Sequence, residues 1–404
     1  MRIFLSAGEP SGDLHGGNLI RQLKSLVPAL EATGFGGPKM RQAGCDNLFD
    51  LADLAVMFFD GLASNFKRFR QLLRQADEYF ANHRVDAVIL IDFPGFNWWV
   101  ARAAKKRGIP VIYYGAPQLW AWAPWRIRKL RRLVDLVLCK LPFEADWFRR
   151  RGVQAQYIGH PFFDETSQVK IDQAFVQNWS ADSRPTLLLL PGSRDREVQQ
   201  HWPVLQSAAY QCQQHLPALR VAVGCFREEH RDLVQQDIQQ RGLDFTPFVH
   251  RTPELMHVAT GCLACSGSVS LELMERRVPT VIVYKLDLLK RFLKWLLLRC
   301  RYITLVNLMW TDDIEGRGLP AYDPDRAGVE NVPMPEYLLT RDRTADIARR
   351  LLAWLSDESL RREQVAWLDT LALKYARPGA SRQAATIVLD YLKRRQKLSA
   401  RSAA

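Results

Sequence analysis

The chain begins with the stretch Ile3-Phe4-Leu5-Ser6-Ala7-Gly8-Glu9-Pro10-Ser11-Gly12-Asp13-Leu14-His15-Gly16. A short apolar run followed by Gly- and Ser-rich turn residues predicts a first strand over 3–6 and a loop behind it. Residues 18–23 have helical spacing, so this loop is expected to open into a helix. In open α/β sheets, ligands bind on such loops at the carboxyl ends of the strands.

The loop at 6–16 is rich in groups that do chemistry. Its reactive side chains are Glu9, Ser11, Asp13 and His15. Its glycines, which let the backbone approach a substrate closely, are Gly8, Gly12 and Gly16. The pattern is neither Gly-x-Gly-x-x-Gly nor a Walker loop, so nucleotide phosphate is not the first expectation. The alternative is a plain Gly-rich turn capped by Asp13.

The length of 404 residues is too great for one ordinary core, and two α/β domains are expected. Apolar runs alternate with helical patterns throughout, which predicts parallel sheets with helices on both faces. The expected strands are 3–6, 87–91, 111–114, 136–139, 186–190, 220–224, 263–265 and 280–284. The expected helices include 66–82, 97–107, 196–215 and 381–395.

The pattern restarts after a polar span between 159–161 and 183–185, which we interpret as a linker with a short helix. We therefore predict two Rossmann-like domains facing a central cleft, the GT-B architecture of nucleotide-sugar glycosyltransferases. The first domain is 1–165, completed by a C-terminal helix at 380–398. The second domain is 180–375.

The formal charge of +13 and the pI near 9.5 indicate an anionic partner. Residues 285–301, and more briefly 66–74, interleave cations with bulky apolar side chains, as in helices that lie in a bilayer interface. The alternative is a core-packing helix with a solvated basic face. No basic tail of the RNA-binding type is present, so nucleic acid is not an expected partner.

The N-terminus runs directly into the first strand and leaves no room for a secretory signal. No apolar run approaches the roughly 18 residues of a membrane span. A cytoplasmic protein is therefore expected. The seven cysteines are scattered, and Cys262 and Cys265 have no second pair at metal spacing, so we expect buried thiols and no metal.

The second half contains an expected phosphate site at 266–272, where a strand is followed by small hydroxylated residues and a helix. Free backbone N–H groups and the positive helix end favour an anion there, and Glu272 can accept both hydroxyls of a ribose. A simply capped helix is the alternative. Arg194 ends the loop after the 186–190 strand, and its guanidinium can donate two hydrogen bonds to phosphate oxygens.

In the first half, Asp92 stands at a strand end and is a natural general base for a sugar hydroxyl. Asn97 is expected to cap the following helix. The loop 115–125 carries three tryptophans in six residues, which either line a sugar or acyl-chain site or plug a space between helices.

Several motifs now line up in order: SAGEPSGDLHG at 6–16, IDFPGFN at 91–97, PQLWAWAPWR at 117–126, LPFE at 141–144, IGHP at 158–161, LLPGSRDREV at 189–198, SGSVSLE at 266–272, VPTVIVYK at 278–285 and PEYL at 335–338. Together they resemble the lipid-A-disaccharide synthases. That family joins UDP-2,3-diacylglucosamine to 2,3-diacylglucosamine 1-phosphate without a metal or cofactor. The products are UDP and a β-1,6-linked disaccharide with inverted anomeric configuration.

The resemblance implies a role for each matching position. Asp92 and Arg194 match catalytic residues, and Glu9 and His15 are further catalytic candidates that orient the glucosamine headgroup or assist Asp92. The acceptor-side loop comprises Gly8, Ser11, Gly12 and Asp13. The donor site comprises Ser193, Ser266, Gly267, Ser268, Ser270, Glu272, Asn307 and Glu336.

Because both substrates carry acyl chains, we expect the enzyme to lie on the cytoplasmic face of the inner membrane, docked through 285–301 with 66–74 as a second stretch. A homodimer is a further expected assembly. The chain departs from the family pattern at Phe93, Gly95, Val306 and Leu339 and carries an extra polar stretch at 310–331. Two alternatives therefore stay open. One is another UDP-sugar enzyme of this fold, an epimerase or a transferase with a different acceptor, and the other is a weakly active paralog that binds nucleotide or lipid.

Overall fold

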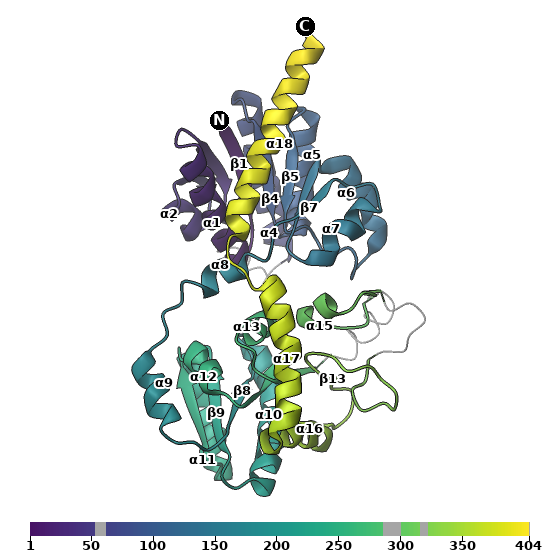
Figure 1. Ribbon diagram of the computed structural model, residues 1–404. Coiled ribbons are helices and arrows are strands. Elements are labelled where there is room, and N and C mark those ends of the chain that lie inside the picture. Colours follow the sequence, from purple (N-terminus) through teal and green to yellow (C-terminus); the bar gives the residue numbers. More distant parts are fainter. Residues whose placement is uncertain (53–61, 286–299, 316–321, 404) are drawn as a thin grey trace. The chain divides into compact units, whose positions relative to one another are not determined.

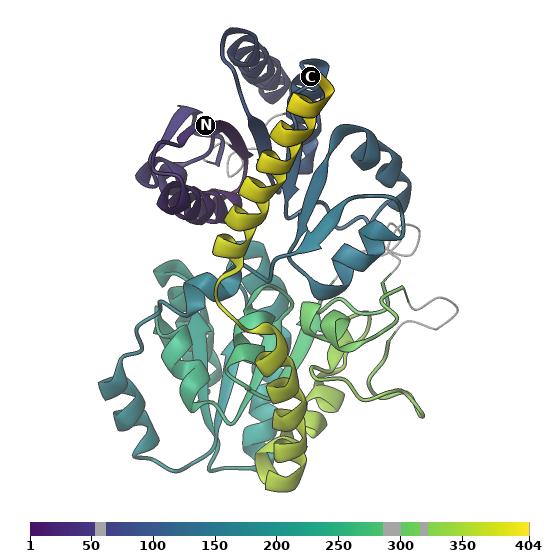
Figure 2. The ribbon, with the colours of Figure 1, turned by 45° about the horizontal axis from the view of Figure 1, so that its top comes forward.

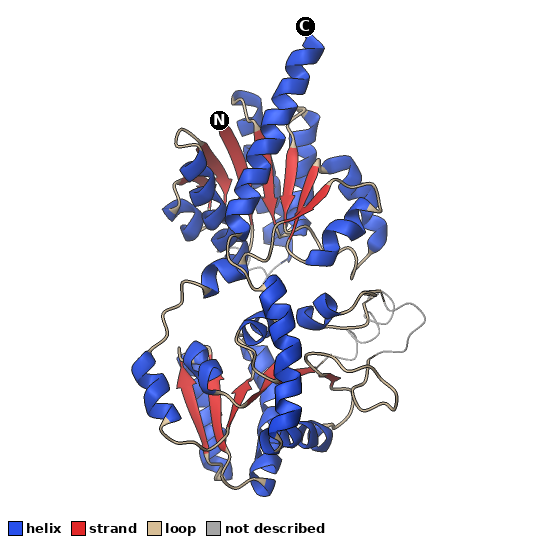
Figure 3. Ribbon diagram, in the orientation of Figure 1, coloured by secondary structure: helices blue, strands red, loops and turns tan. Residues whose placement is uncertain are grey.

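The computed structural model describes residues 1–52, 62–285, 300–315 and 322–403. The chain divides into two compact units, each an α/β sandwich in which strands and helices alternate (Figures 1 and 3). The first unit comprises Met1–Asp164 and Arg377–Ala404, and the second comprises Glu165–Ala376.

The described residues of the first unit form a seven-stranded, fully parallel sheet. Its order is β3 (Cys45–Phe49), β2 (Glu31–Phe35), β1 (Arg2–Ala7), β4 (Ala87–Ile91), β5 (Val111–Tyr114), β6 (Leu136–Cys139) and β7 (Ala155–Tyr157). The strand order reverses direction between β1 and β4. This topological switch point is where open α/β sheets bind their ligands.

Helices cover both faces of this sheet. They are α1 (Pro10–Leu26), α2 (Pro38–Gln42), α4 (Leu62–Asn82), α5 (Pro94–Lys106), the 3₁₀ turn η2 (Pro124–Arg126), α6 (Ile127–Leu133), α7 (Pro142–Arg149) and α18 (Ala380–Ala403), and α8 (Phe162–Thr166) follows β7. α18 lies along the same face as α1 (Figure 2) and adds Ala384, Val388 and Leu392 to the core. On the other face, Phe4 packs edge-on against Phe80 of α4.

The second unit repeats the pattern with a six-stranded parallel sheet. Its order is β10 (Phe245–Val249), β9 (Arg220–Cys225), β8 (Thr186–Leu190), β11 (Gly261–Cys265), β12 (Thr280–Tyr284) and β13 (Glu336–Leu338). Its helices are α9 (Gln173–Ser180), α10 (Asp195–His215), α11 (Glu228–Arg241), α12 (Thr252–Val258), α13 (Val269–Glu275), α15 (Leu305–Trp310), α16 (Thr344–Ser356) and α17 (Glu358–Tyr375). The switch point lies between β8 and β11.

Two expected boundaries were wrong. The first helix begins at Pro10 and not near residue 18, because proline suits the first helical position and the extended Glu9 before it completes the turn. The expected linker is also shorter, because α9 packs into the second unit. There Trp179 contacts Phe248 edge-on, and the guanidinium of Arg220 lies 3.7 Å from the centre of the Trp179 ring.

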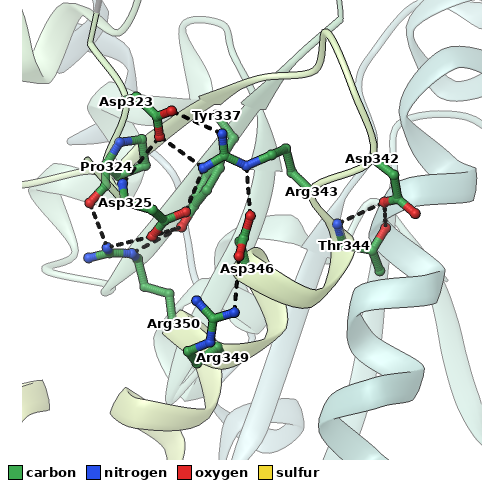
Figure 4. A network of polar contacts seen from close by, with 10 residues as sticks. All are labelled: Asp323, Pro324, Asp325, Tyr337, Asp342, Arg343, Thr344, Asp346, Arg349 and Arg350. Carbon is green, nitrogen blue, oxygen red and sulfur yellow. Dashed lines mark hydrogen bonds and ion pairs between the residues drawn. The ribbon is translucent and has the colours of Figure 1, made fainter. Parts of the chain in front are cut away.

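The extra polar stretch is held to α16 by an ion-pair network (Figure 4). The buried guanidinium of Arg343 donates to both carboxylate oxygens of Asp323, at 2.8 and 3.1 Å, and to Asp325 at 2.6 Å. Arg350 donates to Asp325 at 3.2 Å and to the backbone carbonyl of Pro324 at 3.0 Å. The hydrogen bond from Arg343 lowers the pKa of Asp323. Asp325, Asp346 and Arg350 of this network also line a cavity of about 320 Å³.

Replacing Arg343 with methionine should lower the free energy of unfolding by about 2 kcal/mol at pH 7, because it removes the cation that pairs with the partly buried Asp323 and that shares Asp325 with Arg350. The folded-state pKa values of Asp323 and Asp325 are depressed, so their stabilisation is present at neutral pH and is lost as the pH falls through those values. The deficit should therefore shrink between about pH 5 and about pH 3. Denaturant titration at each pH measures it.

Arg349→Met is the matched control, because Arg349 is exposed and its ion pair with Asp346 is a surface pair. Such a pair contributes at most about 0.5 kcal/mol. Equal losses in the two variants, or a deficit that does not depend on pH, would contradict the assignment.

Candidate functional site

The first candidate site lies at the switch point of the first sheet, where β1 and β4 end side by side. Ala7 pairs with Ile91, the last residues of these strands. Gly8 follows β1, and a Cβ atom placed there would lie only 2.1 Å from the ring of Phe93. Glycine is thus required at Gly8 so that the two strand ends can meet, which differs from the expected approach of a substrate to this backbone.

Asp92 is held in a strained turn directly after β4. Asp92 and Phe93 both have positive φ, 45° and 40°, a conformation that costs free energy in residues other than glycine and concentrates at functional sites. The backbone carbonyl of Asp92 accepts hydrogen bonds from the Tyr113 hydroxyl at 2.7 Å and from the Asn97 amide at 2.9 Å. Neighbouring groups therefore fix the backbone that carries this carboxylate.

The predicted cap at Asn97 was wrong. Helix α5 begins at Pro94 with Phe93 as its N-cap, so Asn97 lies inside the helix and is fully buried. Its amide donates to the carbonyls of Ser6 and Ile91, each at 3.2 Å, and its oxygen accepts from the Ser6 hydroxyl at 2.6 Å. Asn97 thereby ties the ends of β1 and β4 together.

Lys140 completes the pair of charges at this edge, and the sequence analysis missed it. It follows β6, and its ammonium donates to Oδ1 of Asp92 at 3.0 Å. Although burial opposes the shift, nearby carboxylates raise the pKa of Lys140, that of Asp92 most strongly. The sequence feature that could have revealed it is the single lysine between the 136–139 strand and the LPFE motif.

Two histidines and a further carboxylate lie around this pair. His15 is buried, with its ring 6.5 Å from that of Tyr114. Burial, and then the proximity of Lys140 and His15, lower the pKa of His160 well below its usual value, so this imidazole is neutral at pH 7. Glu9, exposed at the start of α1, lies close enough to Lys140 to help raise its pKa. We call Glu9, His15, Asp92, Lys140 and His160 the first-unit site.

The remaining predicted acceptor-side residues lie in the first turns of α1. Ser11 is exposed and Gly12 is buried. Asp13 is also buried, and its carboxylate accepts the backbone N–H groups of Lys39 at 2.9 Å and Met40 at 3.0 Å. These are free N–H groups of the first turn of α2, so Asp13 caps a neighbouring helix.

The second candidate site lies at the switch point of the second sheet. Arg194 follows β8, is mostly exposed, and pairs with Glu197 at 2.8 Å. The other oxygen of Glu197 accepts the backbone N–H groups of Ser193 and Arg194. The carboxylate of Glu197, in α10, therefore fixes the loop, while the guanidinium of Arg194 is exposed to solvent.

The loop after the adjacent strand β11 carries the other predicted donor residues. Gly267 and Ser268 are exposed, Ser266 is half-buried, and the buried Ser270 donates its hydroxyl to the Gly267 carbonyl at 2.9 Å. A short helix, α13, starts at Val269. Glu272 lies in its first turn, where burial raises its pKa and Arg276 lies at 3.4 Å. We call Ser193, Arg194, Ser266, Gly267, Ser268 and Glu272 the second-unit site.

Asn307 and Glu336 are buried and bind each other at 3.2 Å. Glu336 also accepts the backbone N–H groups of Ile303 and Thr304 at the start of α15. The two side chains thus join α15 to β13.

The aromatic loop divides into buried and exposed parts. Trp120 is buried and donates to Glu144 at 2.9 Å, so its side chain fills space inside the first unit. Trp122 and Trp125 are exposed. Burial, and then the nearby guanidinium groups of Arg102, Arg126 and Arg132, lower the pKa of Lys129.

Most of the predicted membrane stretch at 285–301 lies outside the described residues. In the second stretch, 66–74, Arg68 and Arg70 are exposed, whereas Leu72 is buried and Phe69 stacks on Phe96. No helix among the described residues is long and apolar enough to cross a bilayer. All seven cysteines are free, and burial raises the pKa of Cys265 to about 12.

Comparison with solved structures supports the architecture. UDP-GlcNAc 2-epimerase from Neisseria meningitidis bound to UDP-GlcNAc matches with a TM-score of 0.58 at 11% identity, covering 98% of this chain and 100% of the other. The calicheamicin glycosyltransferase CalG4 matches with a TM-score of 0.57 at 14% identity, covering 97% and 98%. The expected GT-B architecture of two Rossmann-like domains is confirmed.

Sequence comparison identifies the family. Lipid-A-disaccharide synthase from Myxococcus xanthus is 32% identical over 397 residues, 97% of each chain. The enzyme of the same name from Trichlorobacter lovleyi is 36% identical over 317 residues, 76% of this chain and 81% of its own. Residues 3–316 match the family described as lipid-A-disaccharide synthetase, and the chain belongs to this family of glycosyltransferases.

Proposed function

We propose that this protein joins UDP-2,3-diacylglucosamine to 2,3-diacylglucosamine 1-phosphate and releases UDP. Family membership supports this reaction. The observation that carries it is the difference between the two switch points. One presents a carboxylate suited to a sugar hydroxyl, and the other presents a guanidinium and a loop of small residues suited to a diphosphate.

The acceptor belongs to the first-unit site in this proposal. Asp92 takes the proton of the acceptor 6-hydroxyl, whose oxygen then forms the bond to the anomeric carbon of the donor. The bond from that carbon to UDP breaks, and its electron pair leaves with the diphosphate. Glu9 and His15 orient the glucosamine headgroup beside Asp92.

The donor belongs to the second-unit site. Arg194 reaches solvent and can share two hydrogen bonds with the diphosphate, whose charge grows as UDP leaves. The exposed backbone at Gly267 and Ser268 offers further N–H donors, and Glu272 can accept the ribose hydroxyls. Asn307 and Glu336 support this site by holding α15 in place.

Asp92→Asn should lower kcat by about 10² to 10⁴, because the amide keeps its shape but cannot take a proton. UDP release with both acylated glucosamines present measures the rate, and binding of UDP should be unchanged. A variant that keeps half of the wild-type rate would contradict the assignment of the base.

Arg194→Ala should lower kcat/KM by about 10² to 10³, because a preorganised donor to the leaving group is lost. Arg362→Ala is the matched control, since Arg362 is also exposed and pairs with a glutamate one helical turn away. The same assay should show no change in that control, and a parallel loss in both variants would argue against a role at the diphosphate.

The same assay separates the alternatives. Release of UDP without acceptor would indicate a hydrolase or an epimerase of the same fold. Binding of UDP without any release would indicate an inactive paralog.

Docking on the cytoplasmic face of an anionic inner membrane is part of the proposal, because both substrates carry acyl chains. The sequence at 285–301 supports it, with 66–74 as a second stretch. The exposed side chains of Trp99 and Trp125 add support, and the guanidinium of Arg102 lies 4.9 Å from the centre of the Trp99 ring. A homodimer remains a hypothesis that the molar mass from light scattering decides.

Replacing Leu288, Phe292 and Trp295 together with serine should weaken sedimentation with anionic vesicles by about tenfold, because interfacial binding scales with buried apolar area. Phe226→Ser is the control, an exposed aromatic residue of the second unit. Unchanged sedimentation of the triple variant would refute docking through 285–301.

A further inference from the structure

Lys140 and Asp92 form a contact that the family resemblance does not assign. Their strands, β4 and β6, are separated by β5. The two side chains must therefore reach across the end of β5, where Gly115 stands. Both side chains are only about one-fifth exposed, 22% for Lys140 and 23% for Asp92.

Gly115 leaves room for this contact. It has a φ of +66°, and a Cβ atom there would lie 2.7 Å from Cε of Lys140 and 3.1 Å from Oδ1 of Asp92. A side chain at this position would force the end of the Lys140 side chain to shift from its place beside Asp92.

The backbone on both sides of the pair is also fixed. The buried carboxylate of Glu144 accepts the N–H groups of Lys140 at 3.1 Å and Leu141 at 3.0 Å. On the other side, Tyr113 and Asn97 donate to the carbonyl of Asp92. The contact is therefore built into the ends of three strands.

The other titratable groups near the pair come from three parts of the first unit. Glu9 and His15 belong to α1 and its N-terminus, Glu144 to α7, and His160 follows β7. His160 is neutral, and Glu144 is engaged with backbone N–H groups and Trp120. Within the described part of the chain, Lys140 is the cation that binds Asp92, and it donates to one carboxylate oxygen, Oδ1.

We propose that Lys140 is a positioning residue for Asp92, which holds Oδ1 and leaves Oδ2 for the acceptor hydroxyl. This inference rests on the proposed role of Asp92 as the general base. An ammonium at hydrogen-bond distance favours the charged form of a carboxylate. Lys140 thus fixes the orientation of the base.

The test compares pH profiles of kcat/KM for UDP release. Lys140→Met should move the acidic limb upward by about one pH unit or more, and should lower kcat at pH 8 by about tenfold through lost orientation. Lys140→Arg keeps the positive charge, so the acidic limb of its profile should lie closer to that of the wild type than the limb of Lys140→Met does. If Lys140 only stabilised the fold, the pH at which kcat/KM falls on the acidic side would be the same in Lys140→Met as in the wild type.

Gly115→Ala provides a second test that removes neither charge. It should move the limb in the same direction as Lys140→Met. Gly152→Ala is the matched control, because Gly152 has a similar φ of +70° but open space around its Cα. An unchanged limb in both Lys140→Met and Gly115→Ala would overturn the proposal, as would a rise in acceptor KM alone, which would make Lys140 an acceptor ligand.

A readout independent of turnover separates this inference from the proposed function. With ¹³C-labelled aspartate, the Asp92 carboxyl resonance is identified by its loss in Asp92→Asn, and its titration is followed in the wild type and in Lys140→Met. A higher pKa of Asp92 in the variant supports the pair even if no UDP is released. An unchanged titration refutes it whatever the activity.

Discussion

Parallel pairing of β1 with β4 and of β8 with β11 is the constraint on which the rest of the structure depends. Parallel strands end at the same edge of a sheet. At each of these two pairs, the sheet grows to one side of the first strand and to the opposite side of the second. The loops that follow are therefore free to carry polar side chains. Asp92 and Arg194 stand on such loops, and the fold places them there before any contact with substrate is considered.

The first sheet adds a second level of order, because buried polar contacts join its strand ends. Asn97 ties β1 to β4, Glu144 holds the start of α7, and Lys140 reaches across Gly115 to Asp92. Each polar group is satisfied by a partner from another strand or helix, so the charged edge is rigid. A base that is fixed in this way loses little orientation freedom when a substrate arrives.

Part of this could be read from the sequence. The expected strands 87–91, 111–114, 136–139, 186–190 and 280–284 agree with β4, β5, β6, β8 and β12, because each is a continuous apolar run bounded by turn residues. Strands β2, β3, β7, β10 and β13 were not among the expected strands. Several of them are short or partly exposed, as at the edges of a sheet, so their apolar pattern is weak.

The sequence by itself determined the alternation of strands and helices, the two-domain architecture and the positions of Asp92 and Arg194 at strand ends, since these follow from local apolar patterns. Only the tertiary structure decided that Asn97 lies inside a helix, that Asp13 caps α2 and that Lys140 binds Asp92. These contacts join residues 5 to 91 positions apart in the chain. Strand order brings such residues together, and no local pattern records that order.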